Sequence, residues 1–150
     1  MPKKKKVFID ASVLIAAATS PDGGSSLVLE VCRGCNFHAT TTRKVLLEAQ
    51  KNIRKKFPSV ILLNFYREIA TINAEAVQPA TQEELSQYNN IIAIKDRHVI
   101  ACAIKSSSAF LITLDRKHFK NEAIKQANLP VTIMTPKEFL YWVKEKYKNL

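Results

Sequence analysis

Two apolar runs in this 150-residue chain each end directly in an aspartate. The run VFI is followed by Asp10, and the run AFLITL is followed by Asp115. Short apolar runs of this kind, rich in β-branched and aromatic residues, predict buried strands. An isolated ionised carboxylate is strongly unfavourable in an apolar interior, yet Asp10 leads straight into a second apolar run. The fold therefore has to place these carboxylates where something compensates their charge.

Strand-like and helix-like segments alternate along the chain, joined by short connections. The expected strands are VFID, NFHATT, AFLITLD and VTIM. The expected helices are ASVLIAAATS, SSLVLEVCRG, residues 41–57, residues 59–75, TQEELSQYNN, KDRHVIACAIKSSS and FLYWVKEKYK. This alternation predicts an α/β fold with a mostly parallel sheet and helices on both faces. The length is that of a single domain, so we expect one domain over residues 1–150.

Helix start signals support several of these boundaries. Thr81 with Glu84, and Thr135 with Glu138, have the spacing of a capping box. Ser25 or Ser26 is the expected N-cap of the helix after the turn SPDGGSS.

The acids following the strands are the candidate catalytic residues. In a parallel sheet all carboxyl ends lie on one edge, and ligands bind there. Asp10 and Asp115 should therefore converge if their strands are neighbours. Asp96 opens the helix that leads to the strand ending in Asp115, and Glu48 is expected on the flank of the apolar stripe of residues 41–57. Four acids can meet at this edge.

Converging carboxylates repel one another unless a counter-charge is present. Oxygen ligands favour Mg²⁺ or Mn²⁺ over zinc or copper. Such a cation acidifies a bound water and stabilises charge on a phosphoryl group, and a second ion is an open alternative, so phosphodiester hydrolysis is the natural reaction. Glu48 either ligates the ion or orients the attacking water. Ser12 and Thr113 are candidate supporting hydroxyls.

Simpler structural roles remain open for each acid. Asp10, Asp96 and Asp115 are also good helix caps or turn formers. Glu48 has lysines four residues before and three residues after it, so a solvated ion-pair face explains it equally well.

A zinc site is a weaker alternative. The chain has three cysteines, and Cys32 and Cys35 have a CxxC spacing, while His98 and Cys102 can share one helix face. The residues around His98 are typical of a core, however, and an odd cysteine count without a secretory signal favours a reducing compartment. We expect a cytoplasmic protein without a membrane partner, since no apolar run approaches the ~20 residues that span a bilayer.

The net charge of +10 and the pI of about 9.7 favour a polyanionic partner, with nucleic acid first among them. The candidate contacts to an RNA backbone are Arg43, Lys44, Lys51, Arg54, Arg97, Arg116 and Lys117. For any single one of them, an ordinary solvated surface position is the simpler interpretation. A nucleotide-binding fold of the Rossmann type needs a glycine-rich turn, and the chain has 3 glycines and no such motif.

Four segments together resemble the PIN-domain family. They are VFIDASVLIAA, the helix bearing Glu48, DRHVIACAI and LITLDRKHF, and the resemblance runs from Val7 to about Thr135. The opening FIDASVLIAAATSPDG is similar to a prokaryotic PIN subfamily of toxin components of toxin–antitoxin systems. The resemblance implies a three-layer α/β/α sandwich and a Mg²⁺- or Mn²⁺-dependent endoribonuclease acting on single-stranded RNA. Its catalytic and metal-binding acids map onto Asp10, Glu48, Asp96 and Asp115.

The resemblance also implies partners, and two departures from the family pattern qualify it. An antitoxin protein and a second copy of the chain are the expected partners, with Phe139, Tyr141 and Trp142 forming either a dimer surface or part of the core. Many relatives carry another acid near Asp96 and a second acid in the last motif, where this chain has His118. His118 binds phosphate or metal, or caps its segment. The alternative function is a catalytically weak or inactive RNA-binding module of the same fold.

Overall fold

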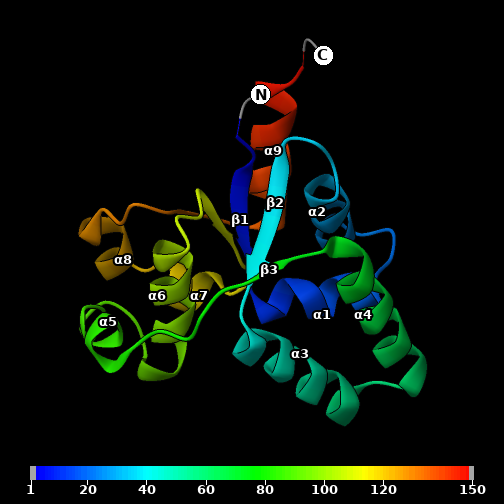
Figure 1. The fold of residues 1–150 in the computed structure, drawn as a ribbon, viewed down its shortest axis with the longest axis horizontal. Helices are drawn as coiled ribbons and strands as arrows, with labels where there is room; N and C mark the ends of the chain where they lie inside the picture. Colours follow the sequence, from blue (N-terminus) through cyan, green and yellow to red (C-terminus); the bar gives the residue numbers. More distant parts are fainter. Residues whose placement is uncertain (1–2, 149–150) are drawn as a thin grey trace.

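The computed structural model describes residues 3–148 (Figure 1). Its strands are β1 (Lys5–Ile9), β2 (Phe37–Thr41), β3 (Glu75–Ala76), β4 (Phe110–Ile112) and β5 (Thr132–Met134). Its helices are α1 (Ala11–Thr19), α2 (Gly24–Cys32), α3 (Arg43–Lys56), α4 (Ser59–Ile72), α5 (Gln82–Ser86), the 3₁₀ helix η1 (Ile94–Asp96), α6 (Arg97–Lys105), α7 (Arg116–Phe119), α8 (Glu122–Ala127) and α9 (Pro136–Lys146). Among these described residues, no helix is both long enough and apolar enough to cross a membrane.

Within the described part of the chain, all strands belong to one parallel sheet in the order β3-β2-β1-β4-β5. The central strand β1 is flanked by β2 and β4, and its last residue, Ile9, lies beside Ile112, the last residue of β4. The predicted parallel sheet is therefore confirmed. The two strands expected to deliver Asp10 and Asp115 are neighbours that end level with each other.

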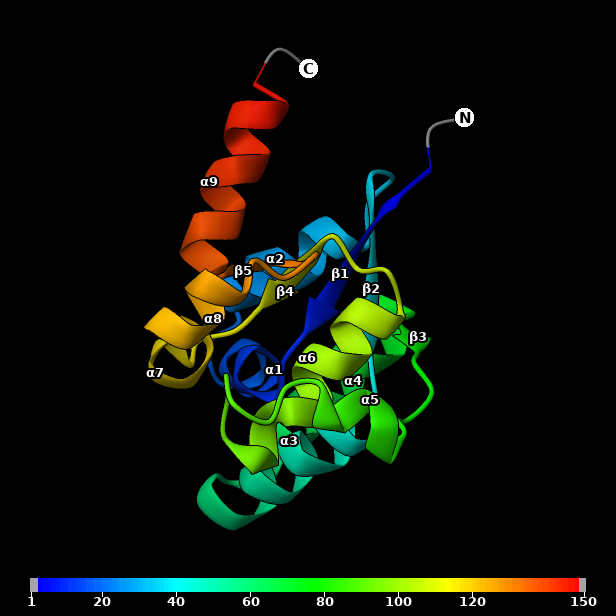
Figure 2. The ribbon, with the colours of Figure 1, turned by 90° about the vertical axis from the view of Figure 1, so that its left-hand side faces the viewer.

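The strand order explains why helices cover both faces of the sheet. From β1 the chain steps to β2 and β3 on one side, and it then crosses back to β4 and β5 on the other side. Because crossovers between parallel strands are right-handed, opposite steps place their helices on opposite faces. Accordingly α1, α2 and α4 lie on one face, and α5, α6 and α8 lie on the other (Figures 1 and 2). The three-layer α/β/α sandwich is confirmed.

Several local boundaries differ from the sequence prediction. The helix expected over residues 59–75 ends at Ile72, because Asn73 adopts a left-handed conformation with φ of 50° and directs the chain into β3. The short elements β3, α7 and α8 were not predicted. The N-cap of α2 is Gly23, and neither serine has that role: Ser26 Oγ instead donates to the carbonyl oxygens of Ala17 and Ser20.

The C-terminal helix α9 packs its aromatic residues inward. Phe139 is fully buried and makes edge-on contacts with Phe37 of β2 and Phe110 of β4, and Trp142 packs against the same two rings. Of the two alternatives left open for Phe139 and Trp142, core packing therefore accounts for both side chains. Tyr141 alone of the three is well exposed.

Candidate active site

The carboxyl ends of β1 and β4 flank the place where the strand order reverses. The helix following β1 leaves toward one face of the sheet, and the helices following β4 leave toward the other (Figure 1). In open parallel sheets, this divergence opens the crevice in which ligands bind. Asp10 directly follows β1, and Asp115 lies three residues beyond β4. Backbone topology alone thus places two of the predicted acids at the usual ligand-binding position.

Asp10 is buried, with only 7% of its surface exposed. Its Oδ2 accepts hydrogen bonds from Thr113 Oγ1 at 2.7 Å and from Ser12 Oγ at 3.2 Å. Burial raises the pKa of the Asp10 carboxyl, and the bonds from Thr113, from the Ala11 backbone and from Ser12 oppose that rise. Asp10 stands at the N-cap of α1 without capping it through its side chain. The hydroxyls of Ser12 and Thr113 therefore hold the Asp10 carboxylate in place, and their part in a catalytic site stays a prediction.

Asp115 is engaged locally as a helix cap. Its Oδ1 accepts the backbone N–H of His118 at 3.1 Å, and its Oδ2 lies 2.7 Å from His118 Nδ1. The backbone N–H of Asp115 donates to Thr113 Oγ1 at 3.1 Å, so the same hydroxyl contacts Asp10 and holds the Asp115 backbone. The capping alternative is thus correct for Asp115. It does not exclude a second role, because a carboxylate has lone pairs beyond those that these two contacts use.

Asp96 has a buried carboxylate oxygen without a partner. Its Oδ2 is shielded from solvent and accepts no hydrogen bond from any described residue. Although Asp96 precedes α6, its side chain makes no capping bond, so the capping alternative is wrong here as well. Burial raises the pKa of the Asp96 carboxyl, whereas the charges of His118 and Lys95 lower it. A buried unpaired carboxylate oxygen costs free energy, which indicates a site organised for something other than stability.

Glu48 lies in α3 and is the most exposed of the four acids, whereas the sequence predicted it on the flank of the apolar stripe rather than on the solvent face. No described residue forms an ion pair with it, so the ion-pair alternative is also wrong. Partial desolvation, followed by the negative charges of Asp10 and Asp96, raises the pKa of Glu48. The charge of Lys44, followed by that of Lys95, opposes this shift. The sequence analysis did not include Lys95, although its position next to Asp96 was a usable signal.

The charges of these side chains and their donor atoms fit a divalent cation. Asp96, Asp115 and His118 each offer a ligand atom within 4.8 Å of those of the other two, and no further group of three such residues occurs in residues 3–148. The unpaired oxygen of Asp96 is one of the donors that a cation would satisfy. The zinc alternative is wrong, because Cys32 lies in α2 on one face of the sheet and Cys102 lies in α6 on the other (Figure 2).

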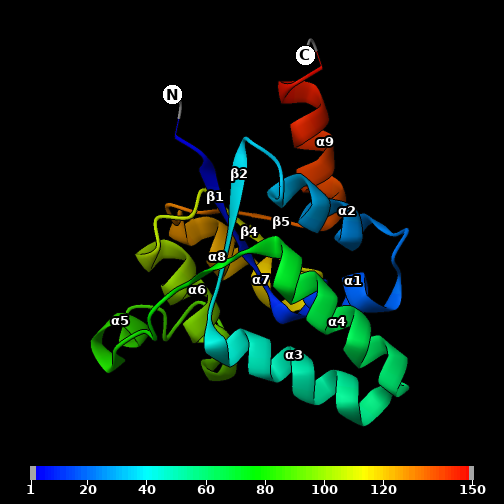
Figure 3. The same ribbon diagram turned by 45° about the vertical axis from the view of Figure 1, so that its right-hand side comes forward.

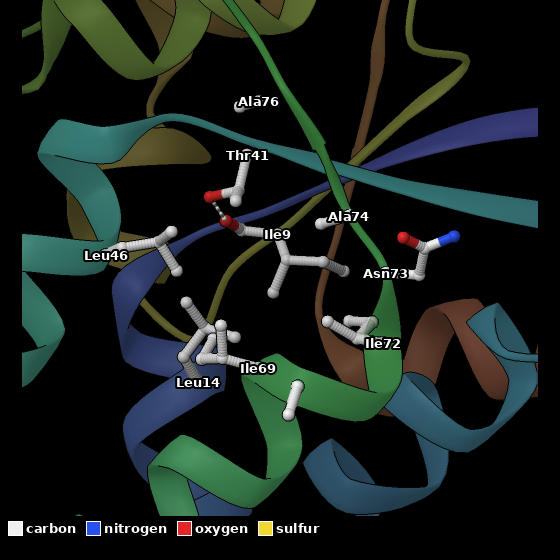
Figure 4. Close-up of a pocket in the computed structure, with 10 residues that line it drawn as sticks. Ile9, Leu14, Thr41, Leu46, Ile69, Ile72, Asn73, Ala74 and Ala76 are labelled. Carbon is white, nitrogen blue, oxygen red and sulfur yellow. Dashed lines mark hydrogen bonds between the residues drawn. The ribbon is translucent and has the colours of Figure 1, made fainter.

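A separate apolar pocket lies beneath the carboxyl ends of β1 and β2 (Figure 4). It has a volume of about 210 Å³ and is lined largely by aliphatic side chains, including Ile9, Leu14, Leu46 and Ile69. The hydroxyl of Thr41 donates to the Ile9 carbonyl at 3.2 Å, the dashed line in the figure. The pocket contains no charged side chain and none of the four acids. It is therefore not a cation site.

Most of the predicted RNA contacts are exposed. Four of them project from α3, two follow Asp115, and one precedes His98; these are Arg43, Lys44, Lys51, Arg54, Arg116, Lys117 and Arg97. Arg97 differs from the rest, because it is half-buried, donates to the side-chain oxygen of Asn89, and has a buried Nε without a partner. The guanidinium is thus held by Asn89, and a contact of Arg97 with RNA stays a prediction.

A family model described as a PIN domain matches residues 6–117. The chain belongs to the PIN-domain family. The matched region includes all four acids and ends one residue before His118. Beyond the family itself, a comparison with curated proteins found no significant match.

Two solved structures share the fold of this PIN domain. PAE2754 from Pyrobaculum aerophilum is 12% identical with a TM-score of 0.60, and the match covers 95% of this chain and 99% of that one. VapC20 from Mycobacterium tuberculosis, a toxin that cleaves the sarcin–ricin loop, is 15% identical with a TM-score of 0.50, and the match covers 84% of this chain and 98% of that one. At these identities the likeness concerns the fold.

Proposed function

We propose that this PIN domain is an endoribonuclease that uses Mg²⁺ or Mn²⁺ to hydrolyse phosphodiester bonds of single-stranded RNA. PIN domains are generally nucleases, and VapC20 is a toxin whose name describes cleavage of an RNA loop. By analogy we also propose that the chain acts as a toxin, with an antitoxin protein as partner. The observation that supports the proposal is that Asp96 and Asp115 offer ligand atoms close enough to share an ion, with one Asp96 oxygen buried and unpaired. The charges of Asp96 and Asp10 also act on each other and on Glu48, so we place Asp10 and Glu48 at the same site.

Each acid has a distinct part in the proposed reaction. Asp10, Asp96 and Asp115 hold the cation, and Asp10 is kept in one orientation by the hydroxyls of Ser12 and Thr113. Glu48 is the acid most open to solvent, so we assign it the role of orienting or deprotonating the attacking water. When bound, the cation supplies an acidified water and neutralises charge developing on the phosphate.

The test is cleavage of a single-stranded RNA by the purified protein with Mn²⁺ or Mg²⁺. Replacing the buried carboxylate in Asp10→Asn should lower the rate at least about 100-fold, because a preorganised charge in the site is lost. Asp22→Asn is the matched control, since it makes the same chemical change at an exposed turn position. The Asp22→Asn control should retain full activity, and a chelator should abolish that activity.

Two results would overturn the nuclease proposal. An Asp10→Asn protein that cleaves as fast as the Asp22→Asn control would mean that the activity comes from elsewhere, such as a contaminating nuclease. A wild-type protein that binds RNA without cleaving it in either metal would favour the RNA-binding module. Circular dichroism of Asp10→Asn shows whether a loss of activity comes from a loss of folding.

A further inference from the structure

The imidazole of His118 lies beside the Asp115 carboxylate, and the surrounding contacts fix its orientation. His118 Nδ1 lies 2.7 Å from Asp115 Oδ2, and its backbone N–H donates to Asp115 Oδ1 at 3.1 Å. Both contacts are made with the same carboxylate, at the start of the single-turn helix α7. The ring is therefore held beside Asp115, and only one ring nitrogen is needed for that contact.

The donor atoms of His118, Asp96 and Asp115 are close enough for one coordination sphere. All three ligand atoms lie within 4.8 Å of one another. Two ligands bound to one ion at about 2.0–2.3 Å can stand no more than about 4.6 Å apart. Small side-chain adjustments would therefore bring all three atoms onto one ion.

The state of Asp96 argues against a purely structural role for this arrangement. If His118 only completed the cap formed by Asp115, nothing would explain why the neighbouring Asp96 keeps Oδ2 buried and unpaired. A cation shared by the three side chains satisfies that oxygen and balances the negative charge of both carboxylates. The 2.7 Å between His118 Nδ1 and Asp115 Oδ2 is close to the spacing of two adjacent ligands on one ion, so the two atoms can share a cation.

We propose that His118 supplies a nitrogen ligand to the catalytic cation, so that the site is a mixed carboxylate–imidazole centre that prefers Mn²⁺ to Mg²⁺. The inference rests on the proposed function, because it concerns the cation of that same site. Mg²⁺ is a hard ion that binds oxygen ligands and retains its waters, whereas imidazole suits transition metals. A nitrogen ligand therefore shifts the preference of the site away from Mg²⁺.

The direct test is pulsed electron paramagnetic resonance of Mn²⁺ bound to the full chain. We expect a coupling between the ion and a nitrogen nucleus. Labelling the histidines of the wild-type protein with ¹⁵N should replace the ¹⁴N coupling by a ¹⁵N coupling. The chain has 3 histidines. The coupling should disappear in His118→Asn and persist in His38→Asn, the matched control, because His38 lies near the amino end of β2, away from the crevice.

The second measurement is the affinity for Mn²⁺ and Mg²⁺ by calorimetry. Replacing the imidazole by a carboxylate in His118→Asp should shift the Mn²⁺-to-Mg²⁺ preference about tenfold or more toward Mg²⁺. His38→Asn should leave the ratio unchanged. If a His118 variant fails to fold, nitrogen coupling that persists in both His38→Asn and His98→Asn assigns the ligand to His118, because the chain has 3 histidines.

The outcomes separate this inference from the proposed function. Mn²⁺ bound at the acids without any nitrogen coupling overturns the histidine ligand and leaves the nuclease proposal standing. Failure of the wild-type protein to bind Mn²⁺ or Mg²⁺ overturns both. Nitrogen coupling that survives in His118→Asn and is lost in His38→Asn also overturns the assignment to His118.

Discussion

At the scale of single residues, Asp10 combines burial with negative charge. A buried carboxylate is tolerated when hydrogen bonds compensate it, and Thr113 provides the shortest of those bonds. The same hydroxyl accepts the backbone N–H of Asp115, so one side chain connects the ends of β1 and β4. Thr113 therefore supports both the stability and the geometry of the site.

Removing this hydroxyl should destabilise the protein. Thr113→Val keeps the shape of the side chain but removes the shortest hydrogen bond to the Asp10 carboxylate and leaves the Asp115 N–H without its partner. We expect the free energy of unfolding to fall by about 1–3 kcal/mol, measured by urea denaturation. Thr113→Ser is the control, because it keeps the hydroxyl and loses only a methyl group. Equal stability of the valine variant and the wild type would contradict the role of the hydroxyl.

At the scale of elements, the start of α9 is tied to the segment after α7. Glu138 completes the predicted capping box with Thr135 and also accepts hydrogen bonds from Lys120 Nζ at 2.6 and 2.8 Å. Lys120 lies two residues beyond His118, so this ion pair links α9 to the chain segment that carries the site. The bonds from Lys120, followed by the backbone bond from Thr135, lower the pKa of Glu138 to about 2.

This pKa predicts a pH-dependent contribution to stability. The pKa of Glu138 is about 2 in the folded protein and 4.5 ordinarily, so the unfolded chain binds more protons than the folded one between pH 2 and pH 4.5. The stabilisation is therefore complete above about pH 4.5 and is lost as the pH falls toward 2. At neutral pH, Glu138→Gln should lower the free energy of unfolding by about 0.5–1 kcal/mol. The effect is small because the carboxylate is partly exposed.

Thermal unfolding at several pH values measures this contribution. The difference between wild type and Glu138→Gln should vanish near pH 2. Glu145→Gln, on the same helix and paired with Lys148 at an exposed position, is the matched control and should differ little from wild type. A Glu138→Gln difference that is constant with pH would show that the charge of Glu138 does not matter.

At the scale of the whole molecule, the lysines and arginines behind the net charge of +10 include two exposed groups, on α3 and on α9. The outer face of α3 carries several of the lysines and arginines, and the same helix carries Glu48, which we propose as a site residue. The helix α9 also carries exposed lysines but stands at the opposite end of the molecule (Figure 3). The structure therefore offers two basic surfaces at different distances from the acids.

Charge reversal on these two helices should have different effects on RNA binding. The double variant Lys51→Glu with Arg54→Glu should weaken binding and reduce the slope of log affinity against log salt by about 1.4, since each lost phosphate contact accounts for about 0.7. Lys144→Glu with Lys146→Glu on α9 makes the same change in net charge and should alter the slope less. Fluorescence anisotropy at several salt concentrations, in the inactive Asp10→Asn background, measures both. Equal slopes for the two variants would mean that α3 is not the RNA surface.

Local patterns were sufficient to predict most helices and strands, the parallel sheet and the acids after β1 and β4. They failed where the outcome depends on neighbours in space. The two-residue strand β3 exists because it pairs with β2. The exposure of Glu48 likewise depends on what covers α3.

The amino-acid sequence by itself determined that carboxylates would follow buried strands and that basic residues would surround them, because periodicity and residue type act between near neighbours in the chain. Only the tertiary structure decided which side chains meet. Thr113 reaches Asp10 across 103 positions, and Asp96 comes close to Asp115 and His118 through the crossover between β3 and β4. Such contacts depend on strand order and packing, which no short segment specifies.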